Sequence, residues 1–168
     1  AVYGLPELHR EELKGARLVA NPGCYVTAAT LALAPLAAEG VLKGAFVVGL
    51  SGGSGAGREA EGTAFAGVNE SLKPYKAGGT HRHIPEMERN LGRILAQGRR
   101  VRTHGEARAV RLSFTPHLVP MTRGILVTAE AEVEGAWSQE SLEALYRDFY
   151  AGEPFVRVLK GLPETKAT

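Results

Sequence analysis

The only cysteine of the chain, Cys24, stands where a short apolar run meets a helix pattern. Residues 17–20 predict a strand, the Pro22–Gly23 pair predicts a tight turn, and the residues from Tyr25 onward predict a helix. The first turn of a helix has unpaired N–H groups and the positive end of the helix dipole, so a thiolate is stabilised there. Cys24 is therefore a candidate nucleophile. The alternative is a small buried apolar residue, which is the usual role of a free cysteine.

A cysteine nucleophile needs a proton donor or acceptor nearby, and His81 and His83 are the candidates. Residues two apart point to the same side of an extended segment, and Pro85 favours extended backbone at Ile84. Arg82 would then face the opposite way. A His-x-His pair also binds zinc, but no convincing third ligand accompanies it, so we expect no metal site. Solvated polar residues in front of a helix are the remaining alternative.

The segment Ser51–Arg58 contains four glycines and two serines in eight residues, which excludes regular structure. Successive backbone N–H groups of such a segment can surround an anion, and Arg58 can form paired hydrogen bonds with a phosphate or carboxylate. It lacks the Gly-Lys-Ser/Thr ending of a Walker loop, and a flexible surface loop is the alternative. Arg123, in a Pro-bounded connection, is a further candidate for binding a carboxylate or phosphate, with a surface salt bridge as its alternative.

Regular elements must position these residues, and the sequence predicts a mixture of helices and strands. Helices are expected at 7–13, 25–38, 85–96 and after an N-cap at Ser138, and strands at 17–20, 45–50, 107–115, 124–133 and 154–159. Pro35 should kink or divide the second helix, and Gly40 should end it. The two alternating strands 107–115 and 124–133 are expected to pair as antiparallel neighbours with an open face. This mixture predicts an α+β fold, with a long irregular segment at 59–80.

The overall composition excludes several classes of protein. The length of 168 residues corresponds to about one domain. A net charge of +2 points to neither nucleic acid nor an anionic membrane. There is no apolar stretch of the ~18 residues that a membrane span needs and no signal peptide. One cysteine excludes an internal disulfide framework and fits a reducing cytoplasm.

Five groups of residues, in their order along the chain, resemble the N-acetyl-gamma-glutamyl-phosphate reductases. They are Asn21-Pro22-Gly23-Cys24-Tyr25, Ser51–Arg58, Asn69-Glu70 with Pro74-Tyr75, His81-Arg82-His83 with Pro85-Glu86, and Phe114–Gly124. Together they span most of the chain, from about residue 17 to 126. Two positions depart from the family pattern, since Val26 stands where a proline is expected and Gly53 where a bulkier residue is expected.

The resemblance implies a fold similar to the catalytic domain of glyceraldehyde-3-phosphate and aspartate-semialdehyde dehydrogenases. That fold is a mixed, largely antiparallel sheet with helices packed on one face. The implied reaction converts N-acetyl-glutamyl 5-phosphate to N-acetyl-glutamate 5-semialdehyde with NADPH, in arginine biosynthesis. Cys24 matches the cysteine that attacks the acyl phosphate. The histidine for proton transfer falls at His81 or His83; we favour His81, although the sequence does not separate the two.

The resemblance also implies binding roles. Substrate or phosphate contacts are expected from His83, Arg58, Asn21 and Arg123. The segment that approaches the nicotinamide side of the cofactor is expected to comprise Ser51, Gly52, Ser54, Gly55, Ala56 and Gly57.

NADP(H) itself is expected to be bound mainly by an N-terminal Rossmann domain, because no strand-glycine-helix fingerprint occurs in this chain. We therefore expect residues 1–168 to be a single catalytic and oligomerisation domain. The N-terminal domain and a C-terminal return segment would be absent, and the fragment would be inactive alone.

Two alternatives stay open at this stage. The sister reductase of carrier-protein-linked lysine biosynthesis would use the same chemistry on a longer aminoadipyl phosphate; the Ser51–Arg58 segment and Asn69-Glu70 favour the arginine enzyme. A non-catalytic oligomerisation or partner-binding module would use the open face of strands 107–115 and 124–133. If the chain is part of the reductase, we expect a small acyl phosphate as its partner and a homo-oligomer formed through the sheet. We also expect a cytoplasmic location and no nucleic acid or membrane partner.

Overall fold

The computed structural model describes residues 1–56, 69–98 and 109–166. The chain forms two compact units. The first contains Ala1–Gly23 and Gly135–Pro163, and the second contains Cys24–Glu134 and Glu164–Thr168. The expectation of a single catalytic domain over the whole chain stays a prediction.

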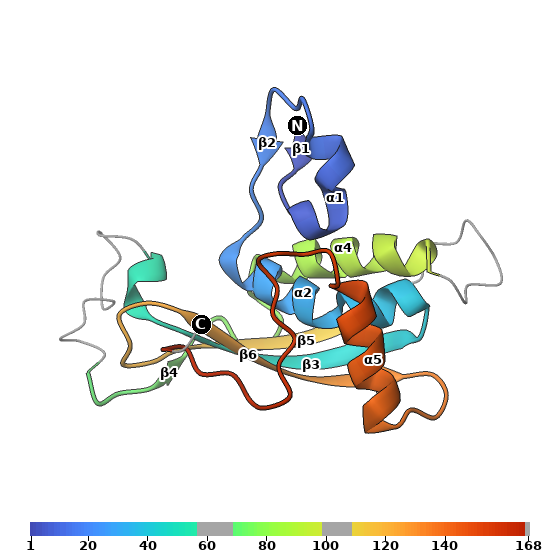
Figure 1. Ribbon diagram of the computed structural model, residues 1–168. Coiled ribbons are helices and arrows are strands. Elements are labelled where there is room, and N and C mark those ends of the chain that lie inside the picture. Colours follow the sequence, from blue (N-terminus) through green and yellow to red (C-terminus); the bar gives the residue numbers. More distant parts are fainter. Residues whose placement is uncertain (57–68, 99–108, 167–168) are drawn as a thin grey trace. The chain divides into compact units, whose positions relative to one another are not determined.

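The second unit is built on a four-stranded sheet with the order β4-β5-β3-β6 (Figure 1). Its strands are β3 (Leu42–Ser51), β4 (Lys73–Pro74), β5 (Arg111–Leu118) and β6 (Ile125–Val133). The central strand β3 pairs with β5 in parallel and with β6 antiparallel, and β4 is antiparallel to β5. The sheet is therefore mixed, with two of its three pairings antiparallel, and the predicted α+β class is confirmed.

The expected pairing of the two alternating strands is wrong. β5 and β6 run in opposite directions, but β3 lies between them and pairs with both. Alternating apolar and polar residues indicate that one face of a strand is covered. They do not indicate which strand pairs with it. β5 also extends to Leu118, through Pro116, where a connecting loop was expected, and positions 107–108 lie outside the described residues.

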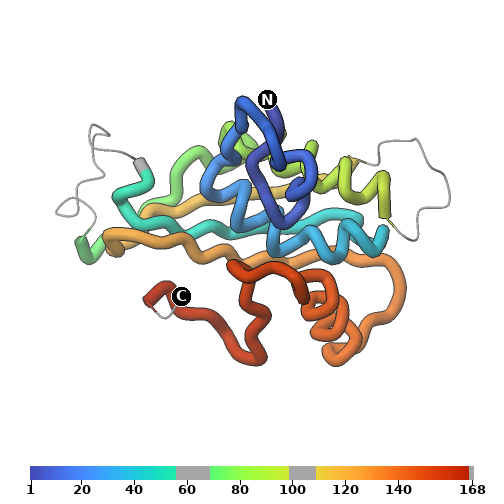
Figure 2. Tube along the Cα trace, turned by 45° about the horizontal axis from the view of Figure 1, so that its top comes forward, coloured from blue at the N-terminus to red at the C-terminus, as the bar shows by residue number. Residues whose placement is uncertain are grey.

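Two helices cover one face of this sheet, as Figure 1 and Figure 2 show. Helix α2 (Cys24–Glu39) contacts α4 (Ile84–Ala96), β3 and β6, and α4 contacts β5. The expected burial of α2 is confirmed, since nine of its sixteen residues are buried. Pro35 is one of them and does not divide the helix. Gly40 ends it as predicted, with a φ of 83° and its N–H bonded to the carbonyl of Ala37.

The first unit consists of β1 (Val2–Tyr3), α1 (Pro6–Leu13), β2 (Val19–Ala20) and α5 (Gln139–Phe149). β1 and β2 form a two-stranded parallel sheet. The predicted N-cap is confirmed, because the Ser138 side chain accepts a hydrogen bond from the N–H of Ser141. The expected strand at 154–159 is wrong: these residues have turns and irregular backbone.

Within the parts of the chain that the structure describes, no helix is long and apolar enough to cross a membrane.

Candidate active site

Cys24 is the first residue of α2, and its side chain is exposed. The predicted setting of a turn followed by a helix is thus confirmed, and the alternative of a small buried cysteine is wrong. This position puts Cys24 at the positive end of the helix dipole. The thiol is accessible to a substrate.

The residue after Cys24 links it to the two histidines. Tyr25 is only 2% exposed, and its ring lies edge-on to the rings of His81 and His83, with centroid separations of 5.9 and 6.2 Å. The two imidazoles are themselves 4.6 Å apart. Phe114 of β5 completes the cluster, 5.1 Å from Tyr25 and 5.3 Å from His81. Three separate segments of the chain therefore meet at the first turn of α2.

Both histidines point inward, as the spacing predicted, but the backbone that directs them is different. His81 and His83 are 6% and 8% exposed, while Arg82 between them is exposed. The segment is a turn, and Ile84 is already the first residue of α4, so the expected extended backbone at Ile84 is wrong. The N–H of Ile84 donates to the carbonyl of His81, which closes the turn. Pro85 is then in the first helical turn, where its missing N–H costs nothing.

One hydrogen bond fixes the proton of His81. The backbone N–H of His83 donates to Nδ1 of His81 at 3.2 Å. Nδ1 therefore accepts, and in the neutral ring the proton must sit on Nε2. His83 differs, because its buried Nδ1 has no hydrogen-bond partner among the residues that the structure describes. His81 is thus held as a neutral Nε2–H donor.

The surroundings of both rings oppose a positive charge. Burial lowers the pKa of His81 to about 4, and the nearby His83, Lys76 and Arg82 act in the same direction. Burial also lowers the pKa of His83, although Glu86 opposes that shift. Both imidazoles are therefore neutral at pH 7.

Acidification from about pH 6.5 to pH 4 is expected to destabilise the second unit. The folded state holds His81 with a pKa of about 4, whereas an unfolded histidine titrates near ~6.5. The unfolded chain therefore binds the proton first, so the stability is complete above ~6.5 and is lost as the pH falls toward 4. We expect a loss of about 2 kcal/mol from His81 over this range.

Urea unfolding followed by circular dichroism at each pH measures this effect. His81→Gln should remove the part of this pH dependence that comes from His81, while the part that comes from His83 stays. His9→Gln, in the first unit, is the matched control and should leave it unchanged. Equal slopes in the unmodified chain and in His81→Gln would contradict this explanation.

The glycine-rich segment begins at the end of β3 and continues into a short 3-10 helix, η1 (Gly53–Ala56). The N–H groups of Gly52, Gly53 and Ser54 donate to the carbonyls of Gly124, Met121 and Thr122. These three N–H groups already have hydrogen-bond acceptors, so the prediction that they surround an anion is wrong for them. A Cβ at Gly52 would lie 2.8 Å from Met121 O and from Arg123 N, so this glycine allows a close approach of two backbones.

The remaining candidate residues differ in how exposed they are. Gly57 and Arg58 lie outside the described residues. Arg123 is exposed in the turn beside Gly52, and Asn21 is an exposed residue of the first unit. Ser54 and Gly55 are exposed, whereas Ser51 is buried, with its hydroxyl bonded to the carbonyl of Gly52. The binding roles of these residues stay predictions.

Three residues of the cluster received no role from the sequence. The hydroxyl of Tyr75 donates to that of Tyr25 at 3.2 Å, and Tyr25 in turn reaches the carbonyl of His117 at 3.5 Å. Nδ1 of His117 is buried and has no hydrogen-bond partner within the described ranges of the chain. All three lie in the groups of residues that carried the family resemblance, which was the available signal.

The structure brings no metal site together among the described residues, where no group of three or more His, Cys, Asp or Glu side chains could hold an ion.

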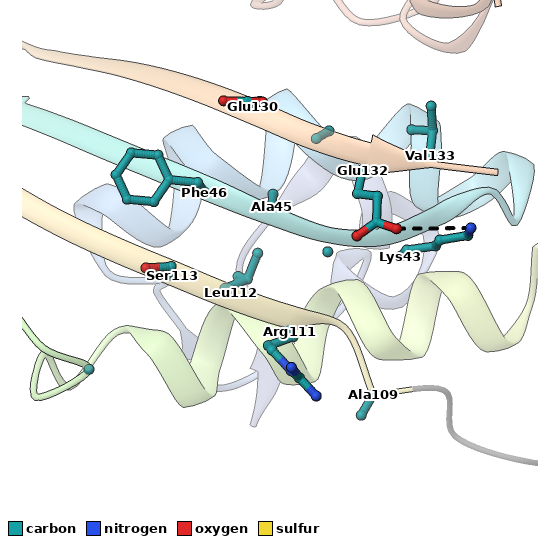
Figure 3. Close-up of a pocket in the computed structure, with 13 residues that line it drawn as sticks. Lys43, Ala45, Phe46, Ala109, Arg111, Leu112, Ser113, Glu130, Glu132 and Val133 are labelled. Atoms are coloured by element: carbon teal, nitrogen blue, oxygen red, sulfur yellow. Dashed lines mark ion pairs between the residues drawn. The ribbon is translucent and has the colours of Figure 1, made fainter. Parts of the chain in front are cut away.

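A hollow of about 940 Å³ lies along the sheet, and its lining residues do not include those of the histidine cluster (Figure 3). Phe46, Ser113 and Glu130 form one cross-strand row of it. Phe46 is 48% exposed, whereas its neighbour Val47 is fully buried on the other face. Lys43 and Glu132 form an ion pair at 3.9 Å at one end. The hollow is thus part of an open sheet face that carries both apolar and charged side chains.

The fold of the chain is similar to that of solved aspartate semialdehyde dehydrogenases. A solved aspartate semialdehyde dehydrogenase II from Vibrio cholerae matches 97% of this chain and 52% of its own chain, with a TM-score of 0.65 and 14% identity. The enzyme from Francisella tularensis matches 88% of this chain and 51% of its own, with a TM-score of 0.63 and 12% identity.

A family model described as semialdehyde dehydrogenase, dimerisation domain, matches residues 24–168, and the chain belongs to this family. An N-acetyl-gamma-glutamyl-phosphate reductase of Thermus thermophilus is 98% identical over the whole chain. One from Symbiobacterium thermophilum is 52% identical over 99% of the chain. The chain spans about half the length of these relatives, 49% and 46% respectively.

Proposed function

We propose that this chain is the catalytic part of an N-acetyl-gamma-glutamyl-phosphate reductase, which reduces N-acetyl-glutamyl 5-phosphate to the 5-semialdehyde in arginine biosynthesis. The observation that carries the proposal is the exposed thiol of Cys24 beside a buried Tyr25 that contacts two neutral imidazoles. The names of the similar proteins support the choice of substrate.

Cys24 is the nucleophile in this proposal. Its sulfur bonds to the acyl carbon, the bond from that carbon to the phosphate oxygen breaks, and the thiol proton leaves with the phosphate. The product is a thioester on Cys24. After reduction, the carbon–sulfur bond breaks, the aldehyde leaves, and the released thiolate takes up one proton from solvent.

His81 supports both stages. The acyl oxygen carries negative charge when sulfur adds and again when the thioester is reduced. Nδ1 of His81 is occupied by the N–H of His83, so the proton available to that oxygen is on Nε2. We therefore assign to His81 the donation of a hydrogen bond from Nε2–H to that oxygen. His83, with its unpartnered Nδ1, is assigned to binding the substrate or its phosphate together with Arg58, Asn21 and Arg123.

NADPH supplies the hydride when it is bound. Of the described candidates for contact with it, Ser54 and Gly55 are exposed, while Ser51 and Gly52 are buried. Among the described residues, a Cβ at Gly55 would meet the Ser51 hydroxyl alone, at 3.5 Å. These residues fit a peripheral contact and not the main binding site, so we propose that NADP(H) is held chiefly by an N-terminal Rossmann domain.

The proposal includes a homo-oligomer formed through the open sheet face, supported by the description of the family and by the exposed Phe46. A cytoplasmic enzyme with no nucleic acid or membrane partner is part of the same proposal.

The substrate is tested by assaying the complete reductase with two acyl phosphates. N-acetyl-glutamyl phosphate and the carrier-linked aminoadipyl phosphate differ by one methylene and by the group on the amine. A pocket fitted to one chain length discriminates by about 10-fold or more in kcat/KM, so we expect that preference for the glutamyl substrate. A preference for the aminoadipyl substrate would favour the lysine enzyme instead.

A further inference from the structure

Tyr25 has no role in the chemistry above, yet it is the residue on which the candidate site converges. Its ring is edge-on to His81, His83 and Phe114, which come from the turn before α4 and from β5. Its backbone follows Cys24 directly in the first turn of α2. A shift of this ring would change the position of both imidazoles.

The sheet leaves space for the Tyr25 ring at Gly49 of β3. Gly49 lies near the C-terminal end of β3, opposite Pro116 on one side and Val127 on the other. A Cβ at Gly49 would lie 2.6 and 2.8 Å from Cε1 and Cδ1 of Tyr25, closer than real contacts allow. Glycine weakens a strand interior, and it occurs where another group approaches closely. The Tyr25 ring is that group.

The hydroxyl is anchored as well. It accepts from the hydroxyl of Tyr75 and reaches the carbonyl of His117. Burial raises the pKa of Tyr25 far above its usual range. The phenol therefore stays neutral and provides position, not protons.

We propose that Tyr25, next to Cys24 in the chain, is a positioning residue seated on Gly49, whose ring keeps His81 and His83 dehydrated and keeps His81 fixed against Phe114. Its catalytic importance rests on the proposed function, but its effect on the histidines does not. The ring excludes water from one side of His81, while His83, Lys76 and Arg82 supply the nearby charges or titratable groups. Loss of the ring should hydrate His81 and let it take up a proton more readily.

Long-range ¹H–¹⁵N NMR of the imidazoles in this chain, recorded against pH, tests the proposal without turnover. In the unmodified chain we expect ring-to-ring contacts of Tyr25 with both histidines, an Nε2–H tautomer for His81, and a titration midpoint well below ~6.5. Tyr25→Phe should keep all three, because it keeps the ring. Tyr25→Leu and Gly49→Ala should raise the midpoint of His81 by about one unit or more.

Gly44→Ala is the matched control. It adds a Cβ to the same strand, 2.9 Å from the carbonyl oxygen of Arg111 and away from Tyr25, so the His81 midpoint should not move. A folded Tyr25→Leu or Gly49→Ala variant with an unchanged His81 midpoint and tautomer would overturn the proposal. If both variants fail to fold, the unmodified chain decides: absence of the Tyr25 contacts, or a normal His81 midpoint, overturns it. Failure of the proposed function would appear separately, as turnover without Cys24.

Discussion

Replacement of Cys24 with serine is expected to lower the turnover of the complete reductase by about four orders of magnitude or more. An alcohol is a far weaker nucleophile than a thiol near neutral pH, and no other cysteine exists in the chain to take over. The binding of NADPH, measured by fluorescence titration, should change little, because Cys24 is not among the residues assigned to the cofactor.

Thr27→Ser is a suitable control, since Thr27 lies in the same first turn of α2. It should retain turnover close to that of the unmodified enzyme. Turnover that survives in Cys24→Ser would rule out the covalent route and would favour the alternative of a non-catalytic oligomerisation module.

Removal of the His81 side chain has the second largest expected effect. His81→Ala should lower kcat/KM by about 10² to 10⁴-fold, the range typical of a lost proton donor. His81→Gln should recover part of this loss, because its amide nitrogen can donate a hydrogen bond near the position of Nε2. The reduction of the acyl phosphate, followed at 340 nm through consumption of NADPH, provides the measurement.

His83→Ala is the comparison that assigns the roles. We expect its main effect on KM, because His83 is assigned to substrate binding. A larger loss of kcat in His83→Ala than in His81→Ala would show that the two roles are exchanged. Each variant needs an unfolding curve, since both imidazoles are buried.

Local patterns predicted the parts of the fold that depend on neighbours in sequence. The start of α2 at Cys24, its end at Gly40 and the cap at Ser138 follow from turn and capping residues, and all three are confirmed. The insertion of β3 between β5 and β6 depends on contacts between residues some 60 to 90 positions apart, which alternation cannot encode. The strand expected at 154–159 has the right composition, but it finds no strand partner among the described residues.

In the candidate site, too, some features depend on residue type and spacing and others on contacts made by the folded chain. The chemistry of Cys24 and of the two histidines is recognisable from residue type and spacing. The tautomer of His81 is not, because it depends on a turn that brings the N–H of His83 onto Nδ1. From the sequence alone, Tyr25 is interpreted as an ordinary core aromatic residue. Only the structure shows that its ring packs directly on Gly49 of β3. Gly49, inside the strand expected at 45–50, was the available clue.

Acylation of Cys24 is the step on which the proposed function depends, and mass spectrometry of the complete protein tests it. The protein is mixed with N-acetyl-glutamyl phosphate in the absence of NADPH, quenched in acid and digested. We expect one N-acetyl-glutamyl group on the peptide that contains Cys24, one equivalent of phosphate released, and loss of the adduct when NADPH is added before the quench. Release of phosphate without an adduct on Cys24, or an adduct on another residue, would contradict the proposed function.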